Sequence, residues 1–123
     1  MKKRILIADD DENLREINSA IVNRLFPNYE TEVFVDGTSL RSRLEQTLEE
    51  VELVITDNDM PGINGSEIIT QYAKKLNLPF ILAYGGDESI GKDALADGAF
   101  DYILKPYSIA DFKEKIKKAI SRD

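Results

Sequence analysis

Four residues that can do chemistry stand where apolar runs of the sequence end. Asp9 and Asp10 follow the first apolar run, Asp57 follows the run at residues 53–55, and Lys105 follows a short run near the C-terminal end. The carboxyl ends of parallel strands are where open α/β sheets bind ligands, so side chains at several such ends can share one crevice. These four residues are therefore the candidate site.

The residue types indicate which chemistry this site can support. Carboxylates that converge on one crevice repel each other unless a cation lies between them. The chain has no histidine and no cysteine, and oxygen ligands favour magnesium, manganese or calcium over zinc or copper. Magnesium usually takes one or two carboxylates and a substrate phosphate, which fits Asp10 and Asp57, with Asp9 one step further out. A metal ion and a lysine ammonium beside a carboxylate suit transfer of a phosphoryl group to that carboxylate.

Each of these residues also has a purely structural explanation. Asp57 can cap a helix or form a turn. The acidic residues 9–12 can form the first turn of a helix, where the helix dipole favours negative charge. Lys105 can simply be solvated. The chemical interpretation therefore depends on whether the fold brings the four residues together.

An alternation of strands and helices is expected to position them. Short apolar or alternating runs predict strands at residues 4–8, 31–35, 53–55, 80–83 and 102–104. Apolar residues spaced three and four apart predict a helix after each strand. The residues expected to face the core are Leu14, Ile17, Ile21 and Leu25, then Leu40, Leu44 and Leu48, then Ile68, Ile69, Tyr72, Ala73 and Leu76, then Ile90, Ala94 and Leu95, and finally Ile109, Phe112, Ile116 and Ile120.

Several polar residues are expected to lie outside these stripes. Asn18 and Arg43 fall on the water-facing sides of the first and second helices, and the lysine-rich face of the last helix is expected to be solvated. Ser66 is a plausible N-cap of the third helix. The fourth helix contains Gly91 and has a short apolar stripe, so we expect it to be mobile.

Five strands that alternate with five helices through short connections predict an α/β fold, in which a doubly wound parallel sheet has right-handed crossovers. Strand order is not written in the sequence. If the first strand lies centrally, the ends of the first, third and fifth strands meet at one edge.

Composition limits the remaining possibilities. With 123 residues, the chain is expected to form one domain over residues 1–123 that buries roughly two thirds of its unfolded surface. The formal net charge of −7 argues against direct binding of nucleic acid. The apolar run at residues 5–8 is too short for a signal segment, and no stretch is long enough to span a membrane. We therefore expect a cytoplasmic protein.

Three stretches of the chain resemble the receiver domain of bacterial two-component response regulators. They are residues 5–10 (Ile-Leu-Ile-Ala-Asp-Asp), 53–62 (Leu-Val-Ile-Thr-Asp-Asn-Asp-Met-Pro-Gly) and 98–106 (Gly-Ala-Phe-Asp-Tyr-Ile-Leu-Lys-Pro). They occur in the family's order, and the resemblance covers nearly the whole chain. It implies a flavodoxin-like fold in which the five strands have the order 2-1-3-4-5.

The resemblance also implies a role for each site residue and a magnesium cofactor. It implies a cis peptide bond before Pro106. The implied roles are Asp57 as the phosphoryl acceptor, Asp10 as a direct magnesium ligand, Asp9 as its outer-shell partner, Asp59 as the donor of a backbone carbonyl to the metal, Lys105 as the partner of the phosphoryl group, and Tyr102 as an aromatic rotamer switch.

One position departs from the family's pattern. Receivers usually place Thr or Ser at the end of the fourth strand, where the hydroxyl contacts the phosphoryl group. Counting back from Lys105 without gaps gives Ala83, which we favour, and counting forward from Pro79 gives Tyr84. Neither has the small hydroxyl side chain, so coupling to Tyr102 is in question. Tyr84 is also expected to crowd the rim of the site.

The leading hypothesis is a receiver that takes a phosphoryl group from a histidine kinase or phosphotransfer protein and loses it slowly by hydrolysis. It would then change its face between the fourth strand and the fifth helix for a downstream protein or an effector domain outside this chain. One alternative is a pseudo-receiver, an interaction module without useful phosphorylation. The other is a haloacid-dehalogenase-type phosphatase, because Asp57 and Asp59 resemble that family's Asp-x-Asp motif.

Overall fold

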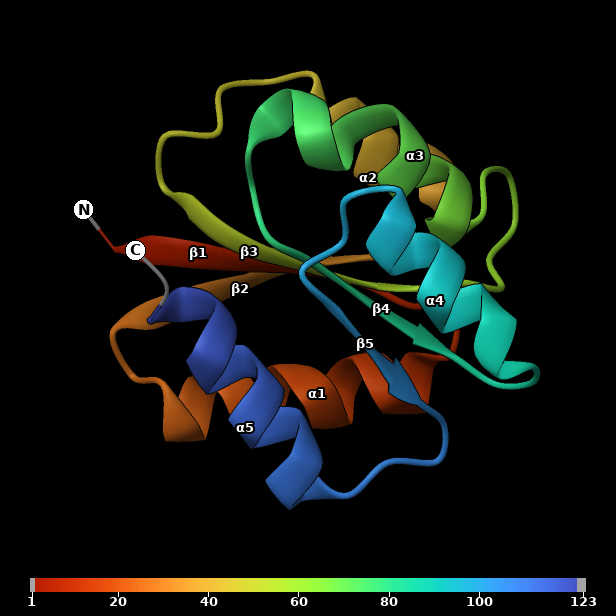
Figure 1. Cartoon of the computed structure of the whole chain (residues 1–123). Coiled ribbons are helices and arrows are strands. Elements are labelled where there is room, and N and C mark those ends of the chain that lie inside the picture. The colour runs from red at the N-terminus through yellow and green to blue at the C-terminus, as the bar shows by residue number, and fades with distance from the viewer. Residues whose placement is uncertain (1, 122–123) are drawn as a thin grey trace.

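The computed structural model describes residues 2–121, and over these residues five strands alternate with five helices (Figure 1). The strands form one parallel sheet in the order β2-β1-β3-β4-β5, which confirms the predicted fold class and strand order. The elements are β1 (Lys3–Ala8), α1 (Glu12–Leu25), β2 (Tyr29–Phe34), α2 (Gly37–Leu44), β3 (Val51–Asp57), α3 (Gly65–Leu76), β4 (Phe80–Tyr84), α4 (Glu88–Ala96), β5 (Asp101–Leu104) and α5 (Ile109–Ile120).

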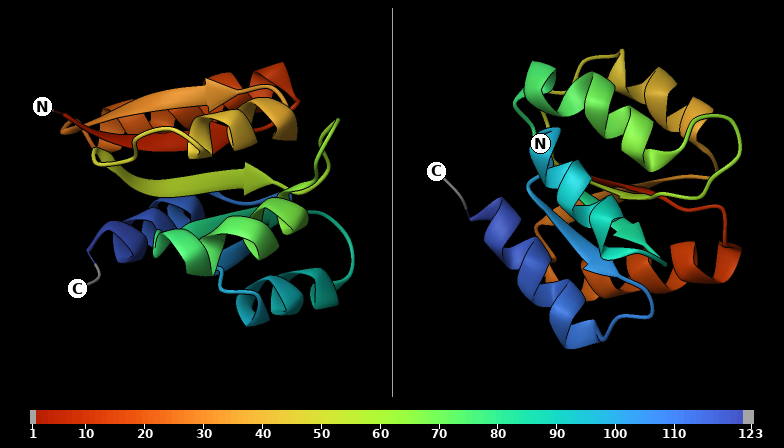
Figure 2. Two further views of the ribbon diagram at one scale, coloured as in Figure 1. Left: turned by 90° about the horizontal axis from the view of Figure 1, so that it is seen from above. Right: turned by 45° about the vertical axis from the view of Figure 1, so that its right-hand side comes forward.

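Helices cover both faces of this sheet (Figures 1 and 2). Helices α1 and α5 lie on one face, and α2, α3 and α4 lie on the other. Side chains alternate along each strand, so Ile5 and Ile7 enter the core under α1 and α5, whereas Leu6 and Ala8 enter the opposite core. Because both faces are covered, the central strands are apolar in nearly every position, as the sequence predicted.

The register of the parallel strands places their carboxyl ends at one edge. Ala8 of β1 pairs with Thr56 of β3, and Asp57 pairs with Ala83 of β4. Ala83 in turn pairs with Ile103 of β5. The carboxyl ends of β1, β3 and β5 therefore lie at the same edge of the sheet.

The first helix does not bury the stripe that its sequence predicted. The fully buried side chains of α1 are Asn18 and Val22, whereas Ile17 is 52% exposed and Leu25 is 37% exposed. The buried face is rotated from the prediction because α1 packs against both the sheet and the β5–α5 loop. That loop supplies a hydrogen-bond partner for Asn18, namely the hydroxyl of Tyr107.

Two other polar residues also differ from their predicted places. The Arg43 side chain is only 12% exposed, because it forms ion pairs with Glu32 at 3.0 Å and with Glu50 at 2.7 Å. Helix α3 is capped by Asn64, whose side chain accepts a hydrogen bond from the Glu67 backbone N–H at 2.8 Å. Ser66 is therefore not the cap.

One residue in each of the last two helices contacts β5. Gly91 of α4 lies against Tyr102, and a Cβ atom there would approach the ring's Cδ2 atom to 2.5 Å. The predicted mobility of α4 stays a prediction. On α5, Lys115 is not simply solvated, because its Nζ atom pairs with Asp101 Oδ2 at 3.0 Å.

Within residues 2–121, no helix is both long enough and apolar enough to cross a membrane.

Candidate functional site

Asp57 is the last residue of β3, and its side chain is 6% exposed. Its Oδ1 atom accepts a hydrogen bond from the Asn58 backbone N–H at 3.0 Å and lies 2.9 Å from Lys105 Nζ. The Asn58 N–H also points toward the Ala83 carbonyl of β4 at 2.9 Å. The carboxylate is therefore held in place by the strand that carries it, by the next residue and by a lysine from another strand end.

The first strand end contributes Asp9 and Asp10. Asp9 is buried, and its Oδ2 atom lies 3.3 Å from Lys105 Nζ. Its Oδ1 atom accepts from the Asp11 backbone N–H at 3.0 Å. Asp11 is the N-cap of α1 and Glu12 lies in its first turn, so the structural explanation of an acidic helix turn applies to these two residues. That explanation accounts for neither Asp9 nor Asp10.

The three carboxylates form a compact cluster. One carboxylate oxygen from each of Asp9, Asp10 and Asp57 lies within 4.8 Å of the others. Asp10 is the exposed member, so the cluster is open to solvent on one side. The donor set contains oxygen only, which suits a hard cation such as magnesium, and an exposed edge leaves room for its waters. Asp59 lies beyond this cluster in the exposed β3–α3 loop.

Burial and the neighbouring charges shift the pKa values of both Asp57 and Lys105. Burial raises the pKa of the Asp57 carboxyl, and the negative charge of Asp9 adds to this effect, whereas Lys105 and the Asn58 N–H oppose it. Burial opposes the charged form of Lys105, but the bond to Asp57 and the charges of both aspartates outweigh it, so the pKa of Lys105 is raised. Lys105 therefore remains a cation, and a second cation at the cluster would favour the ionised form of Asp57.

The end of β4 shows which residues occupy the position where receivers usually have Thr or Ser. Ala83 is the residue paired with Asp57, and its methyl group cannot donate a hydrogen bond. Tyr84 points to the opposite face of the sheet, where it is 1% exposed in the core under α4. Its hydroxyl lies 3.5 Å from the Glu88 carbonyl. The expectation that Tyr84 crowds the rim of the site is therefore wrong, because side chains alternate along a strand.

Tyr102 lies beside this buried tyrosine. The two ring centroids are 5.9 Å apart and the ring planes are tilted by 52°. Lys115 Nζ lies 5.9 Å from the Tyr102 ring centroid. The Lys105-Pro106 peptide bond is cis, as the resemblance implied.

Two polar contacts near the site were missed by sequence reasoning. The Asn58 side-chain oxygen accepts from both the backbone N–H and the hydroxyl of Ser66, at 3.0 Å and 2.6 Å, which ties the loop after Asp57 to the start of α3. An asparagine directly after a strand was a local signal for such a contact. The Asn18–Tyr107 hydrogen bond joins residues 89 positions apart, so no local sequence pattern could predict it.

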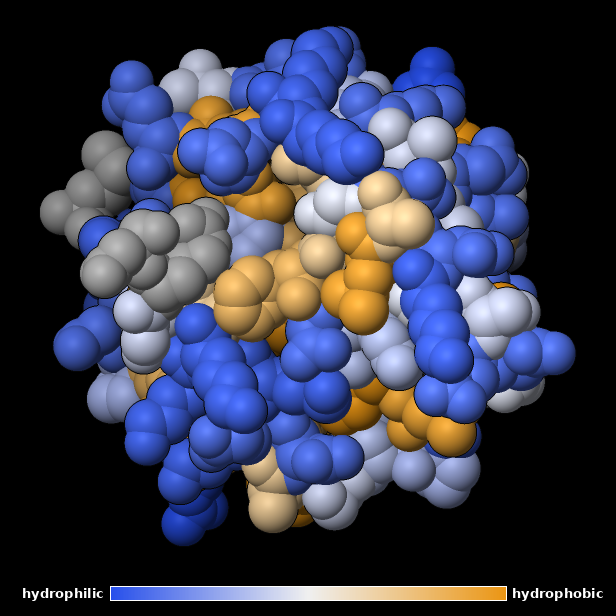
Figure 3. Space-filling view, in the orientation of Figure 1, coloured by the Kyte–Doolittle hydropathy of each residue, from blue (hydrophilic) through white to orange (hydrophobic). Residues whose placement is uncertain are grey.

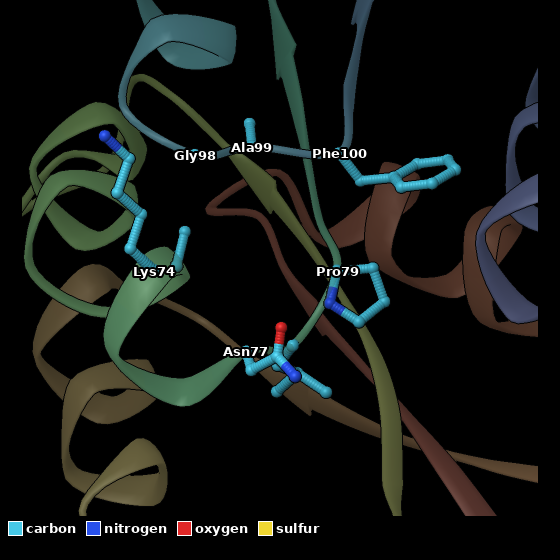
Figure 4. A pocket seen from close by; sticks show the side chains of 8 residues that line it. Lys74, Asn77, Pro79, Gly98, Ala99 and Phe100 are labelled. Carbon is cyan, nitrogen blue, oxygen red and sulfur yellow. The ribbon is translucent and has the colours of Figure 1, made fainter. Parts of the chain in front are cut away.

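The face of the molecule seen in Figure 3 is mostly hydrophilic, with an apolar area in the middle of the view, near the point where β4 and β5 begin. A hollow of about 520 Å³ lies there, and its lining includes Asn77, Pro79 and Phe100 (Figure 4). None of the site residues lines it. The hollow and the acidic cluster therefore lie at opposite ends of the strands.

We expect Asp10→Asn to separate two effects of the acidic cluster on stability, namely the repulsion among its carboxylates and the binding of magnesium. Without magnesium, the variant should be slightly more stable than the wild type, because one of three mutually repelling carboxylates is gone. Magnesium at 100 times its dissociation constant should stabilise the wild type by about 2.7 kcal/mol, and the variant much less. Urea unfolding with and without magnesium measures both effects.

Glu12→Gln is the matched control, since Glu12 is an exposed carboxylate in the first turn of α1. It should keep the full response to magnesium. An equal magnesium response in Asp10→Asn and the wild type would show that Asp10 is not a ligand.

Known proteins that resemble this chain are response regulators and their receiver domains. The model of the response regulator receiver domain family matches residues 5–117. Response regulator ArlR of Staphylococcus epidermidis is 34% identical over 121 residues, which cover 96% of this chain and 52% of that protein. DNA-binding response regulator MtrA of Mycobacterium leprae is 25% identical over 124 residues, which cover 100% of this chain and 53% of that protein. The chain thus spans about half the length of these curated relatives.

Solved structures of receiver domains have the same fold as this chain. A response regulator receiver domain protein from Clostridium thermocellum superimposes with a TM-score of 0.88 and 25% identity, over 98% of this chain and 95% of that one. A CheY-like receiver domain protein from Methanospirillum hungatei JF-1 gives a TM-score of 0.85 and 29% identity, over 98% of this chain and 94% of that one.

Proposed function

This chain belongs to the response regulator receiver domain family, and we propose that it accepts a phosphoryl group on Asp57 in a magnesium-dependent reaction. The donor is a histidine kinase or a phosphotransfer protein, because the chain has no histidine of its own. The observation that carries the proposal is the contact of 2.9 Å between Lys105 Nζ and Asp57 Oδ1 at the acidic cluster. An ammonium beside a buried carboxylate is where a transferring phosphoryl group would need positive charge.

The site residues have distinct roles in this reaction. An Asp57 carboxylate oxygen attacks the phosphorus atom as the P–N bond of the donor phosphohistidine breaks, and the donor imidazole keeps the electron pair of that bond. Lys105 neutralises charge on the phosphoryl oxygens. Asp10, Asp57 and the Asp59 carbonyl would hold a magnesium ion, with Asp9 further out, and the bound ion would supply additional positive charge.

Phosphorylation then changes the face between β4 and α5. Ala83 offers no hydroxyl to the phosphoryl group, so the change must reach that face by other contacts. The Lys105 backbone N–H donates to the Tyr84 carbonyl at 2.7 Å, and the Tyr84 ring lies next to Tyr102. A shift of Lys105 toward a phosphoryl group would therefore pull on the strand end that carries Tyr84.

The same proposal includes where the receiver acts, what receives its output and how the signal ends. Residues 1–123 act as one receiver unit in the cytoplasm. The output passes to a downstream protein or to an effector domain outside this sequence. The receiver itself does not contact nucleic acid or a membrane, and slow hydrolysis of the aspartyl phosphate ends the signal.

The second candidate is a pseudo-receiver that binds partners without useful phosphorylation, and the observation that favours it is Ala83 beside Asp57. A haloacid-dehalogenase-type phosphatase is less well supported, because membership of the receiver family accounts for the same residues.

Intact-mass measurement distinguishes these candidates. The wild type is incubated with acetyl phosphate in the presence of magnesium, and separately with a chelator. We expect a gain of one phosphate that requires magnesium. No gain in either condition would support the pseudo-receiver. Turnover of p-nitrophenyl phosphate that is lost in Asp59→Ala would support the phosphatase.

A further inference from the structure

A neutral hydrogen bond joins α1 to the loop that follows β5. The Asn18 side-chain nitrogen Nδ2 donates to the Tyr107 hydroxyl at 2.8 Å. Asn18 is 3% exposed and shares the buried side of α1 with Val22. An asparagine here must give up its bonds to water, which is unfavourable unless a partner replaces them. An apolar side chain would fill the same face without that requirement.

Tyr107 is well placed to act as the partner, because it lies two positions after Lys105 in the chain. Its ring stacks on Phe112 of α5, with centroids 5.2 Å apart and planes inclined by 18°. Tyr107 is therefore held by α5 through its ring and by α1 through its hydroxyl. The backbone between Tyr107 and β5 carries Lys105.

The sheet alone does not join the two segments that this bond connects. In the order β2-β1-β3-β4-β5, strands β3 and β4 separate β1 from β5. Asp9 and Asp10 follow β1, whereas Lys105 follows β5. The Lys105–Asp9 ion pair at 3.3 Å also connects these segments, but binding of a cation or a phosphoryl group would change the charges around it. The Asn18–Tyr107 hydrogen bond is between neutral groups, so binding of such charged ligands would not weaken it directly.

We propose that Asn18 and Tyr107 are positioning residues for phosphorylation, and that their hydrogen bond holds the β5–α5 loop against α1 so that Lys105 is directed at Asp57. This inference rests on the proposed function. It adds to that function a device that aligns the lysine-bearing segment with the aspartate-bearing segments. Small misplacements of a reacting group can slow an enzymic step substantially.

The test is a double-mutant cycle on the phosphorylation rate. Tyr107→Phe removes the hydroxyl and keeps the ring that stacks on Phe112. With saturating acetyl phosphate and magnesium, we expect it to slow phosphorylation about tenfold in an otherwise wild-type protein. In a Lys105→Ala background it should slow the residual rate by less than about twofold, because the group that it positions is absent.

Asn18→Leu removes the same bond from the other side and should give a similar decrease. The combined Asn18→Leu and Tyr107→Phe protein should be no slower than either single variant. Val22→Ala is the matched control, since it removes buried volume one turn further along α1. It should lower stability without slowing phosphorylation.

Amide signals provide a readout that does not need phosphorylation. The Asn58 N–H donates to the Asp57 oxygen that Lys105 contacts, and the Asp11 N–H donates to Asp9. We expect Tyr107→Phe to shift the Asn58 and Asp11 peaks in a ¹H–¹⁵N spectrum, and Val22→Ala to leave them in place.

The outcomes separate this inference from the proposed function. Equal slowing by Tyr107→Phe with and without Lys105, or no slowing and no movement of the two amide peaks, would overturn the positioning role. If the wild type takes up no phosphate at all, the proposed function fails. The amide peaks then decide the positioning role by themselves, because unmoved peaks overturn it and shifted peaks support it.

Discussion

Asp57→Asn is expected to abolish the uptake of phosphate completely. The carboxamide has nearly the same shape as the carboxylate, so it fits the same buried position at the end of β3. It carries no negative charge and is a poor nucleophile toward phosphorus, so the bond that would form the aspartyl phosphate cannot form. Intact mass after incubation with acetyl phosphate and magnesium should show the unmodified protein only.

The variant also tests whether the acceptor has been assigned correctly. Asp93→Asn makes the same chemical change on an exposed residue of α4, and this protein should gain one phosphate like the wild type. Persistent uptake by Asp57→Asn would mean that another residue is the acceptor. Asp10 would then be the first to examine, since it is the exposed member of the same cluster.

Lys105→Ala is expected to have the second largest effect, a decrease of about a hundredfold in the phosphorylation rate. The lysine is the cation that contacts Asp57 directly, at 2.9 Å. In the proposed reaction, its removal would take away the positive charge that balances negative charge on the transferring phosphoryl oxygens, and a hundredfold loss of rate corresponds to a barrier higher by about 2.7 kcal/mol. A time course of intact mass at saturating donor measures the rate.

Two further variants test whether the decrease in rate is specific to the charge and position of Lys105. Lys105→Arg keeps the charge but changes its geometry, so its rate should fall between those of the wild type and Lys105→Ala. Lys113→Ala removes an exposed lysine from α5 and should react at the wild-type rate. If Lys105→Ala reacts as fast as the wild type, charge balance at the phosphoryl group does not depend on this lysine.

Much of the fold could be predicted from local patterns. Apolar runs at β1, β3 and β4 are long enough to mark buried strands, and the stripe of Ile68, Ile69 and Tyr72 faces the core as predicted. These patterns are reliable because a residue buried on either side of a covered sheet must be apolar, whatever its exact neighbours. The strand order itself came from the resemblance to receivers, because pairing between strands is not encoded in any one segment.

Positions that depend on distant partners were predicted less well. Asn18 and Arg43 were expected to face water, but each is buried or nearly so, because Tyr107 and the pair Glu32 and Glu50 satisfy their polar groups. A helical pattern counts polar residues as solvent-facing and has no knowledge of a partner elsewhere in the chain.

The sequence by itself determined the chemical inventory of this protein: oxygen ligands without imidazole or thiol, and a lysine at the end of a late strand. Only the tertiary structure decided that Asp9, Asp10, Asp57 and Lys105 share one site, and that Tyr84 turns away from it. The physical reason is that residue type sets what a side chain can do. Strand register and helix packing set what it can reach, and both arise from contacts between residues far apart in the chain.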